Sequence, residues 1–410
     1  MTPSLSEPGG VRPVVARWTI IGELILETAT HLGGGAGDIA DMVLICDART
    51  GGPLLPGTSI AGALRSHLGD VLGGYRSQED ERVALLFGGA RGSDLGAQSP
   101  LIVFDSLGAL PDHHASEIRN GVQLDAARGI AEEHKKFDLE VLPPGTSFPM
   151  RFDLVVSCAD EEPDLLALLV AALSGFSGGD IALGARRSRG LGAARATRWK
   201  ATRYELSSRE GWLAWLLTDG NAPSAERELD DVREACLRAF GSCALPEVRD
   251  RRRRLLVDVD VKATGGLLVR SAPGFPDAPD AAHIRSAGRS VLPGTSLAGV
   301  LRKQALRIAR VVRGEKGDGE HWIDRLFGPR MEGIADAGDR ELRASKLRIT
   351  EGVVEGARAR GRLGFASTGS PRASCQERCS MRSLITAGGY AYGSSCENPR
   401  LGSLASLSSF

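Results

Sequence analysis

The sequence of 410 residues has no apolar run near the roughly 20 residues that a membrane-spanning helix needs. Its first residues also lack the basic and then apolar pattern of a secretory signal. Basic and acidic residues number 51 each, so the net charge is zero, which argues against binding nucleic acid through bulk charge alone. These absences predict a cytoplasmic protein with no membrane partner.

Cysteine and lysine are also scarce. The seven cysteines are scattered without a disulfide framework, and the pair Cys375 and Cys379 has no matching Cys/His set, which argues against a zinc site. Only 7 of the 51 basic residues are lysine and 44 are arginine. Arginine suits bidentate contact with phosphate, but a GC-rich genome also encodes it often, so this bias alone does not decide between the two readings.

The most informative feature is an internal repeat. The segment LPGTSIAGALR at 55–65 returns as LPGTSLAGVLR at 292–302, and LFGG at 86–89 returns as LFGP at 326–329. A strand-like alternation of apolar and charged residues precedes each copy. A repeat of this length indicates duplicated domains, because solenoid repeats are far shorter.

Each PGTS motif begins a predicted helix, which Thr58 or Ser59 can cap in the first copy. Apolar positions then recur at the spacing of one buried helix face, and His67 on that face is expected to be a packed histidine. Residues 100–106 are predicted to form a strand, 137–156 two strands around a Pro-Pro-Gly turn, and 163–173 a helix.

The remaining segments are less regular. Residues 201–253 form a polar connector that ends in RDRRRR at 249–254, which we interpret as a domain junction in preference to a phosphate contact. From Ala357 the periodicity stops, and the stretch to Phe410 has the composition of a truncated or frame-shifted second unit. We expect this tail to be poorly ordered.

Two segments contain candidate functional residues. The stretch 178–192 joins glycines, whose N–H groups can approach phosphate oxygens, to arginines that can neutralise them, although a solvated loop explains it equally well. In THLGGGAGDIADMVLICD at 30–47, the aspartates Asp38, Asp41 and Asp47 follow a glycine run. They can bind a divalent metal or accept a proton, and they can equally be turn residues and caps.

Together these pieces resemble the RAMP superfamily, specifically the backbone subunits of type III CRISPR effector complexes. The motifs that carry the resemblance are HLGGG with its following aspartates, LPGTSIAGALR, LFG, PLIVFDS and GARRSRGLG, over 15–200 in full and 254–355 in part. The resemblance implies an α+β protein of two tandem, modified ferredoxin-like (RNA-recognition-like) units. We expect the first at 1–200, a connector at 201–253, an incomplete second unit at 254–356 and the aberrant tail at 357–410.

The resemblance also implies an antiviral function. Subunits of this family stack along a guide RNA, and a loop aspartate cleaves the complementary target RNA with a divalent metal, Mg²⁺ or Mn²⁺. Counting back from PGTS places that aspartate, and the metal, at Asp41, and in the second unit at Asp280, with Asp277 as a competitor. The expected partners are guide RNA, target RNA and other CRISPR effector subunits.

RNA-binding residues follow from the same resemblance. They are expected to be His31, Gly33, Gly34, Arg65, Gly184, Arg186, Arg187, Arg189, Gly190, Gly192 and Arg302. Two other functions remain open: a structural backbone subunit that does not cleave, and a guide-processing endoribonuclease of the same superfamily.

Overall fold

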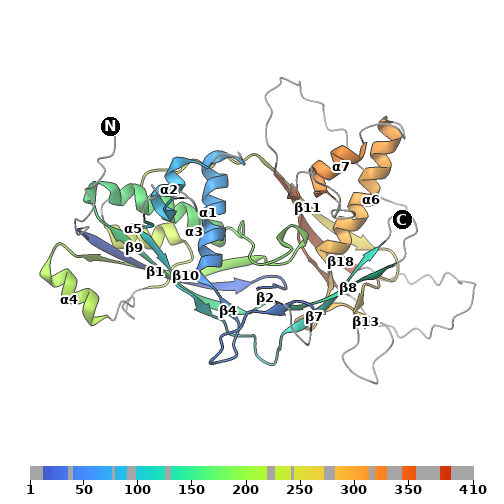
Figure 1. Ribbon diagram of the computed structural model, residues 1–410, viewed down its shortest axis with the longest axis horizontal. Helices are drawn as coiled ribbons and strands as arrows, with labels where there is room; N and C mark the ends of the chain where they lie inside the picture. The colour runs from blue at the N-terminus through green and yellow to red at the C-terminus, as the bar shows by residue number, and fades with distance from the viewer. Residues whose placement is uncertain are drawn as a thin grey trace, which may run out of the picture.

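The computed structural model describes the chain in eleven stretches. These are residues 13–35, 40–75, 79–89, 98–124, 131–218, 227–241, 244–271, 282–313, 319–329, 344–356 and 379–388. They form two units of mixed helix and antiparallel sheet, so the predicted α+β class is confirmed (Figure 1).

The first unit is built on a four-stranded sheet in the order β10-β1-β9-β5. The strands are β1 (Ala16–Leu26), β5 (Leu101–Val103), β9 (Ser147–Val156) and β10 (Ala194–Glu205). Helix α1 (Gly57–Gly73) lies between β1 and β5 in the chain, and α3 (Glu162–Ser177) between β9 and β10. This βαββαβ order, with the last strand beside the first, is the ferredoxin-like arrangement.

Helices α1 and α3 cover one face of this sheet (Figure 1). The buried face of α1 contains the residues that the periodicity predicts, His67 among them. The ring of His67 packs against α3, where a Cβ atom at Gly175 would lie 2.5 Å from His67 Nε2. The prediction of a packed histidine is therefore confirmed, and Gly175 allows the two helices to approach closely.

Shorter strand pairs extend the unit on the side away from the helices (Figure 1). These pairs are β2 (Gly33–Gly35) with β3 (Val43–Leu44), β4 (Leu54–Leu55) with β6 (Ser106–Leu107), and β7 (Glu117–Leu124) with β8 (Ala131–Val141). The Pro-Pro-Gly turn does join two strands, β8 and β9, but they do not pair with each other.

The expected connector belongs largely to the first unit. Strand β10 crosses the expected boundary at residue 200. Two helices follow, α4 (Arg209–Leu217) and α5 (Val232–Phe240), and the α5 residues Val232, Ala235 and Cys236 join the same hydrophobic core as the sheet. The polar composition of 201–253 concealed these few apolar residues, which are enough to hold the segment on the sheet.

The second unit repeats the first. Its strands are β11 (Arg254–Ala263), β12 (Arg270–Ser271), β13 (Ala282–His283), β14 (Arg285–Ser286), β15 (Arg289–Leu292), β16 (Leu347–Ile349), β17 (Gly352–Glu355) and β18 (Cys379–Gly388). Its helices are α6 (Gly294–Arg313) and α7 (Gly319–Phe327), the counterparts of α1 and of α2 (Glu81–Phe87). Hydrogen bonds repeat as well: Ser99 Oγ donates to the Leu86 carbonyl, and Ser345 Oγ to the Leu326 carbonyl.

Strand β18 corrects the expectation for the tail. It lies beyond Ala357, pairs with β11 as β9 pairs with β1, and pairs with β16 as β9 pairs with β5. At least this part of the tail therefore belongs to the second unit, because backbone pairing along β11 does not require an alternation of apolar residues in β18. The remainder, 357–378 and 389–410, lies outside the described residues. Within those described, the second unit has no counterpart of α3 or β10.

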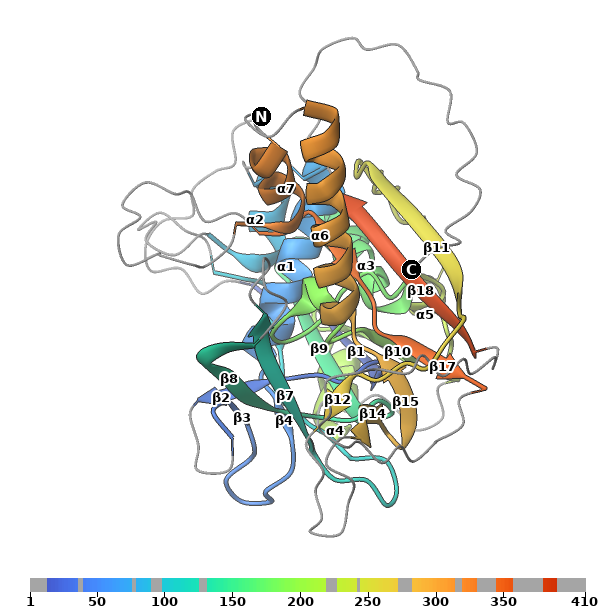
Figure 2. The ribbon, with the colours of Figure 1, turned by 90° about the vertical axis from the view of Figure 1, so that its right-hand side faces the viewer.

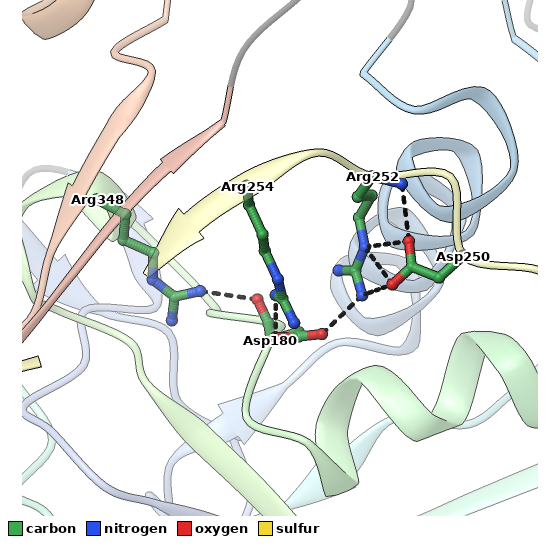
Figure 3. A network of polar contacts seen from close by, with 5 residues as sticks. All are labelled: Asp180, Asp250, Arg252, Arg254 and Arg348. Carbon is green, nitrogen blue, oxygen red and sulfur yellow. Dashed lines mark hydrogen bonds and ion pairs between the residues drawn. The ribbon is translucent and has the colours of Figure 1, made fainter. Parts of the chain in front are cut away.

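Charged side chains join the connector and the second unit to the first unit (Figure 3). Asp180 lies just after α3, and its carboxylate accepts hydrogen bonds from Arg252 at 2.9 Å and from Arg254 at 2.5 Å. The backbone carbonyl of Asp180 accepts a third hydrogen bond, of 2.7 Å, from Arg348 of β16. Arg252 also pairs with Asp250. The structure thus supports the domain-junction interpretation of RDRRRR for Arg252 and Arg254. No helix among the described residues could cross a bilayer.

Burial makes His67 a source of pH dependence. Burial, and secondarily the charge of Arg252, lowers the pKa of His67 from 6.5 to about 4. The unfolded chain therefore binds a proton at His67 between about pH 6.5 and 4 that the folded chain does not, so stability falls as the pH drops through this range. We expect wild type to lose about 2 kcal/mol more than His67→Leu between pH 7 and pH 5 in urea unfolding. Parallel losses in the two proteins would contradict this.

Candidate nucleic-acid interface

Asp41 lies at the base of the β7–β8 hairpin, close to strand β8. Its side chain is exposed, and its Oδ2 accepts a hydrogen bond of 2.8 Å from the backbone N–H of Asp138. The neighbouring Met42 exchanges backbone hydrogen bonds with Asp138 and Glu140, so the short segment before β3 runs along β8. The aspartate is thus held on a fixed backbone while its carboxylate remains accessible.

His31 connects the HLGGG segment at 31–35 to strand β8. It is 3% exposed, and its Nδ1 lies 2.7 Å from the carbonyl oxygen of Glu140. Because a carbonyl can only accept, Nδ1 donates this bond. The Glu140 carboxylate in turn accepts from the N–H of Leu44 at 3.0 Å and from Ser116 Oγ at 2.7 Å. His31 is therefore a buried link between the loop and the hairpin.

The other residues of this loop differ in their placement. Gly33 lies beside the His31 ring, and Gly34 lies against the backbone of Leu44, where a Cβ atom would be 2.6 Å from the carbonyl oxygen. Asp47 is a turn residue, because its carboxylate accepts from both the N–H and the hydroxyl of Thr50. Those hydrogen bonds lower the pKa of Asp47. Asp38 lies outside the described residues.

The glycine-rich loop packs mainly through its backbone. Gly184 has a φ of +77°, and a Cβ there would lie 2.1 Å from the His31 carbonyl oxygen, which accepts from Ala185 N–H at 3.0 Å. Gly190 has a φ of +92° and packs against the backbone of the second unit. A Cβ atom at Gly190 would lie 2.6 Å from the backbone N of Glu351. Gly192 fits against Leu183 in the same way. The glycines are needed for these close approaches whether or not RNA binds.

The arginines of this loop point to different surroundings. Arg186 stacks over the ring of Phe137 at the base of β8, 4.1 Å from the ring centroid. Burial, and then the charge of Arg189, lowers the pKa of Arg186. Arg187 and Arg189, in the short helix η2 (Arg187–Arg189), are exposed. The loop therefore presents two exposed arginines, while Arg186 contacts β8.

Backbone pairing gives the register of the second unit. The N–H of Ile45 donates to the Leu32 carbonyl, and that of Ile284 to the Val269 carbonyl, so Ile45 corresponds to Ile284. Counting back four residues from each isoleucine gives Asp41 and Asp280. Both Asp280 and its competitor Asp277 lie outside the described residues. By the same register, Leu268 occupies the place of His31 and Arg270 that of Gly33.

Arg65 and Arg302 occupy equivalent positions in the two PGTS helices, and both are paired. Arg65 makes two hydrogen bonds to the Glu79 carboxylate, at 2.8 and 2.7 Å. Arg302 pairs with Asp324 and donates to the Gly328 carbonyl at 2.8 Å. Each arginine thus has an acidic or carbonyl partner inside its own unit.

Among the residues that the structure describes, Asp41 has no partner ligands for a divalent metal. Among the described residues, no group of three or more His, Cys, Asp or Glu side chains could hold a metal ion. The nearby carboxylates of Asp138 and Glu140 already accept hydrogen bonds. Mg²⁺ commonly binds one or two carboxylates together with substrate phosphates, so Asp41 fits such an ion only when RNA supplies the other oxygens.

Sequence reasoning missed the hairpin residues of this interface. Phe137, Asp138 and Glu140 lie about a hundred positions after Asp41, and no local motif marks them. The one available signal was the strand pattern of 137–156, which predicted the strand but not the strand's partner.

Comparison with known families agrees with this architecture. The sequence model of the RAMP superfamily matches residues 23–195 and 264–392, one match in each unit. No curated protein sequence matches the chain. The second match extends through β18, consistent with the strand pairing of the second unit. Since the two matches cover most of its residues, the chain belongs to the RAMP superfamily, whose members are CRISPR-associated RNA-binding subunits.

Proposed function

We propose that this protein is a guide-RNA-binding backbone subunit of a type III CRISPR effector complex that cleaves the paired target RNA. The observation that carries the proposal is the exposed carboxylate of Asp41, held against the base of the β7–β8 hairpin by the Asp138 N–H. A hairpin that displaces a nucleotide would bring the adjoining phosphodiester to this carboxylate.

RNA cleavage places modest demands on the protein. The 2′-hydroxyl is an internal nucleophile, so the protein must chiefly align it with the phosphorus and manage charge. The Asp41 carboxylate can accept the hydroxyl proton or contribute one ligand to a divalent ion. Such an ion, when bound, would neutralise charge that develops on the phosphate oxygens. The target sequence would be read by pairing with the guide, while the protein contacts backbone and shape.

Replacing Asp41 tests the cleavage. We expect Asp41→Asn to abolish one cut in end-labelled target RNA within the assembled complex while RNA binding is retained. The amide oxygen of asparagine can still accept from Asp138 N–H, so the loop geometry is kept and only the charge is lost. Chelation of divalent ions should produce the same loss in wild type.

The matched control is Asp47→Asn, six residues along the same segment and engaged only with its own turn. This variant should cut as wild type does. If Asp41→Asn gives every wild-type fragment at the wild-type rate, Asp41 is not the catalytic carboxylate.

The repeat predicts a second cut. Asp280→Ala should remove a fragment different from the one that Asp41→Ala removes, because each aspartate stands four positions before the isoleucine that the two repeats share, Ile45 and Ile284. Mapping both sets of fragments on a sequencing gel measures this. Loss of the second fragment in Asp277→Ala, with Asp280→Ala unaffected, would assign the role to Asp277.

The three arginines of the glycine-rich loop should contribute to guide binding. We expect the combined change of Arg186, Arg187 and Arg189 to Ala to weaken guide RNA binding and to reduce the slope of log K against log salt. Each lost phosphate contact lowers that slope by about 1. Arg198→Ala is the control. Arg198 lies on β10 and is exposed, but its charge is already paired with Glu23 and Glu228, so its loss should leave the slope unchanged. An unchanged slope in the triple variant would remove this loop from the RNA interface.

The alternative function is a backbone subunit that binds RNA without cutting it. In that case the Asp41 and Asp280 variants would bind guide and target like wild type, and wild type would leave the target intact with or without divalent ions.

A further inference from the structure

Strand β11 of the second unit is the counterpart of β1 in the first. Leu101 of β5 and Leu347 of β16 are equivalent, because the carbonyl of each accepts from the serine two residues earlier. Two steps of strand pairing lead from Leu101 to Trp18 of β1, and from Leu347 to Leu255 of β11. Trp18 therefore corresponds to Leu255, at the same offset as that between the two PGTS motifs, and the other residues of the two strands match in order.

The apolar face of β11 is exposed, whereas that of β1 is buried. On β1 the large side chains of this face are at most 1% exposed, and they are Trp18, Ile20, Leu24 and Leu26. On β11 the exposed fraction lies between 36% and 65%, at Leu255, Val257, Val259 and Val261. Helix α6 differs from α1 in the same way, because Ile308 is 52% exposed and its counterpart Val71 only 5%. We call the four β11 residues together with Ile308 the open face.

In the first unit, α3 and β10 cover the equivalent surface. Strand β10 pairs with β1 from Ala16 to Leu26, and α3 contributes Glu162, which accepts a hydrogen bond of 2.7 Å from Trp18 Nε1. In the second unit the described residues provide neither element, and β11 is the edge strand of its sheet beside β18 (Figure 2). An edge strand presents N–H and C=O groups that can pair with a further strand.

The first unit contacts the second at other points and leaves the open face exposed. Arg119 of β7 forms an ion pair of 3.2 Å with the buried side chain of Glu351, just before β17. Asp180 pairs with Arg254, the first residue of β11. From Leu255 to Lys262 every residue of the strand is exposed. Contact between the two units therefore does not supply the cover that β11 lacks.

We propose that the open face binds a helix–strand segment of a separate polypeptide, with its strand antiparallel to β11 and its helix against α6. The segment repeats, between two molecules, the contact that α3 and β10 make within the first unit. Pairing along the edge of β11 supplies backbone hydrogen bonds. Burial of the open face supplies the hydrophobic contribution to binding.

Charge specifies one position of the incoming strand. On the outer side of β1, Glu23 accepts a hydrogen bond of 2.8 Å from Arg198 of β10. Its counterpart on β11 is Asp260, which is exposed. The segment should therefore have an arginine at the place of Arg198, where it can form the equivalent ion pair with Asp260.

Size specifies a second position. Gly22 of β1 leaves room for the indole of Trp199 on β10, because a Cβ atom at Gly22 would lie only 2.7 Å from Trp199 Cε3. The counterpart of Gly22 on β11 is Val259, whose side chain occupies that room. The incoming strand should therefore have a small residue such as alanine at the place of Trp199.

A second copy of this chain fits the β11 edge less well. The antiparallel registers that bring the apolar residues of two β11 strands together over most of their length place Asp258 opposite either Asp258 or Asp260 of the other copy. Like charges directly opposite each other destabilise a strand pair. A strand with an arginine at this point is therefore favoured over a second β11.

Peptides that copy β10 test the proposal on the full-length protein without RNA. The probe is a fluorescein-labelled peptide of residues 194–205 with Trp199→Ala. In fluorescence anisotropy it should bind about tenfold more tightly than the same peptide with Trp199, because Val259 leaves no room for the indole. A peptide of residues 162–205 with Trp199→Ala adds the α3 helix and should bind about tenfold more tightly again, because the helix buries the open face.

A charge reversal tests the register. Asp260→Arg in the protein should weaken binding of the Trp199→Ala peptide about fivefold, since an ion pair is replaced by repulsion. A further change of Arg198→Asp in the peptide should restore binding to this variant and weaken binding to wild type. Glu355→Arg is the matched control, because Glu355 is exposed on β17, which lies inside the sheet and not at its β11 edge. This variant should bind both peptides as wild type does.

Hydrogen exchange decides where the peptide binds and what else could cover the edge. The amides of β11 should exchange rapidly in wild type alone and be protected when the peptide is bound. Equal binding by wild type and Asp260→Arg, or no protection of β11, would show that this edge is not the receiver. Protection of β11 in the monomer alone would mean that the chain covers its own edge, and protection only in a dimer would identify a second copy; either result overturns the proposal. Because RNA is absent throughout, failure here leaves the cleavage proposal intact.

Discussion

The start of each PGTS helix lies so close to the strand that follows it that only glycine fits between them. At Gly57 and Gly294 a Cβ atom would lie 2.4 and 2.5 Å from a strand carbonyl oxygen. This contact fixes the direction of α1 over the first sheet and of α6 over the second (Figure 2). The pairs β4–β6 and β15–β17 follow from it, because each joins the residue just before the helix to the residue just after the strand.

The same constraint explains how much of the fold could be predicted. LPGTS and LFG are short, and their glycines fill close contacts or adopt positive φ angles, so the repeat and the two-unit architecture could be recognised from the sequence. The limits of the units were harder to predict because they depend on a few apolar contacts within polar sequence. Cys236 and Leu245 lie in the first core although their segment has the composition of a linker, and β18 joins the second sheet without an alternating pattern.

In the candidate site, too, locally encoded features could be predicted from the sequence and contacts between distant segments could not. Asp41 could be named because its distance from PGTS is a matter of counting along the chain. Phe137 and Glu140, which position Arg186 and His31, come from a distant hairpin whose pairing is not encoded near either residue. The composition of the glycine-rich loop suited phosphate binding and a solvated loop equally, and Gly184 and Gly190 have packing roles that a single sequence cannot separate from either.

The ion pairs of Asp180 with Arg252 and Arg254 tie the connector down at the point where the second unit begins. The connector therefore acts as a short tether between the second unit and the glycine-rich loop. Such a tether gives the two an effective concentration that is in the millimolar range for flexible linkers. An interface built from backbone contacts and one buried ion pair can then form without a large apolar area.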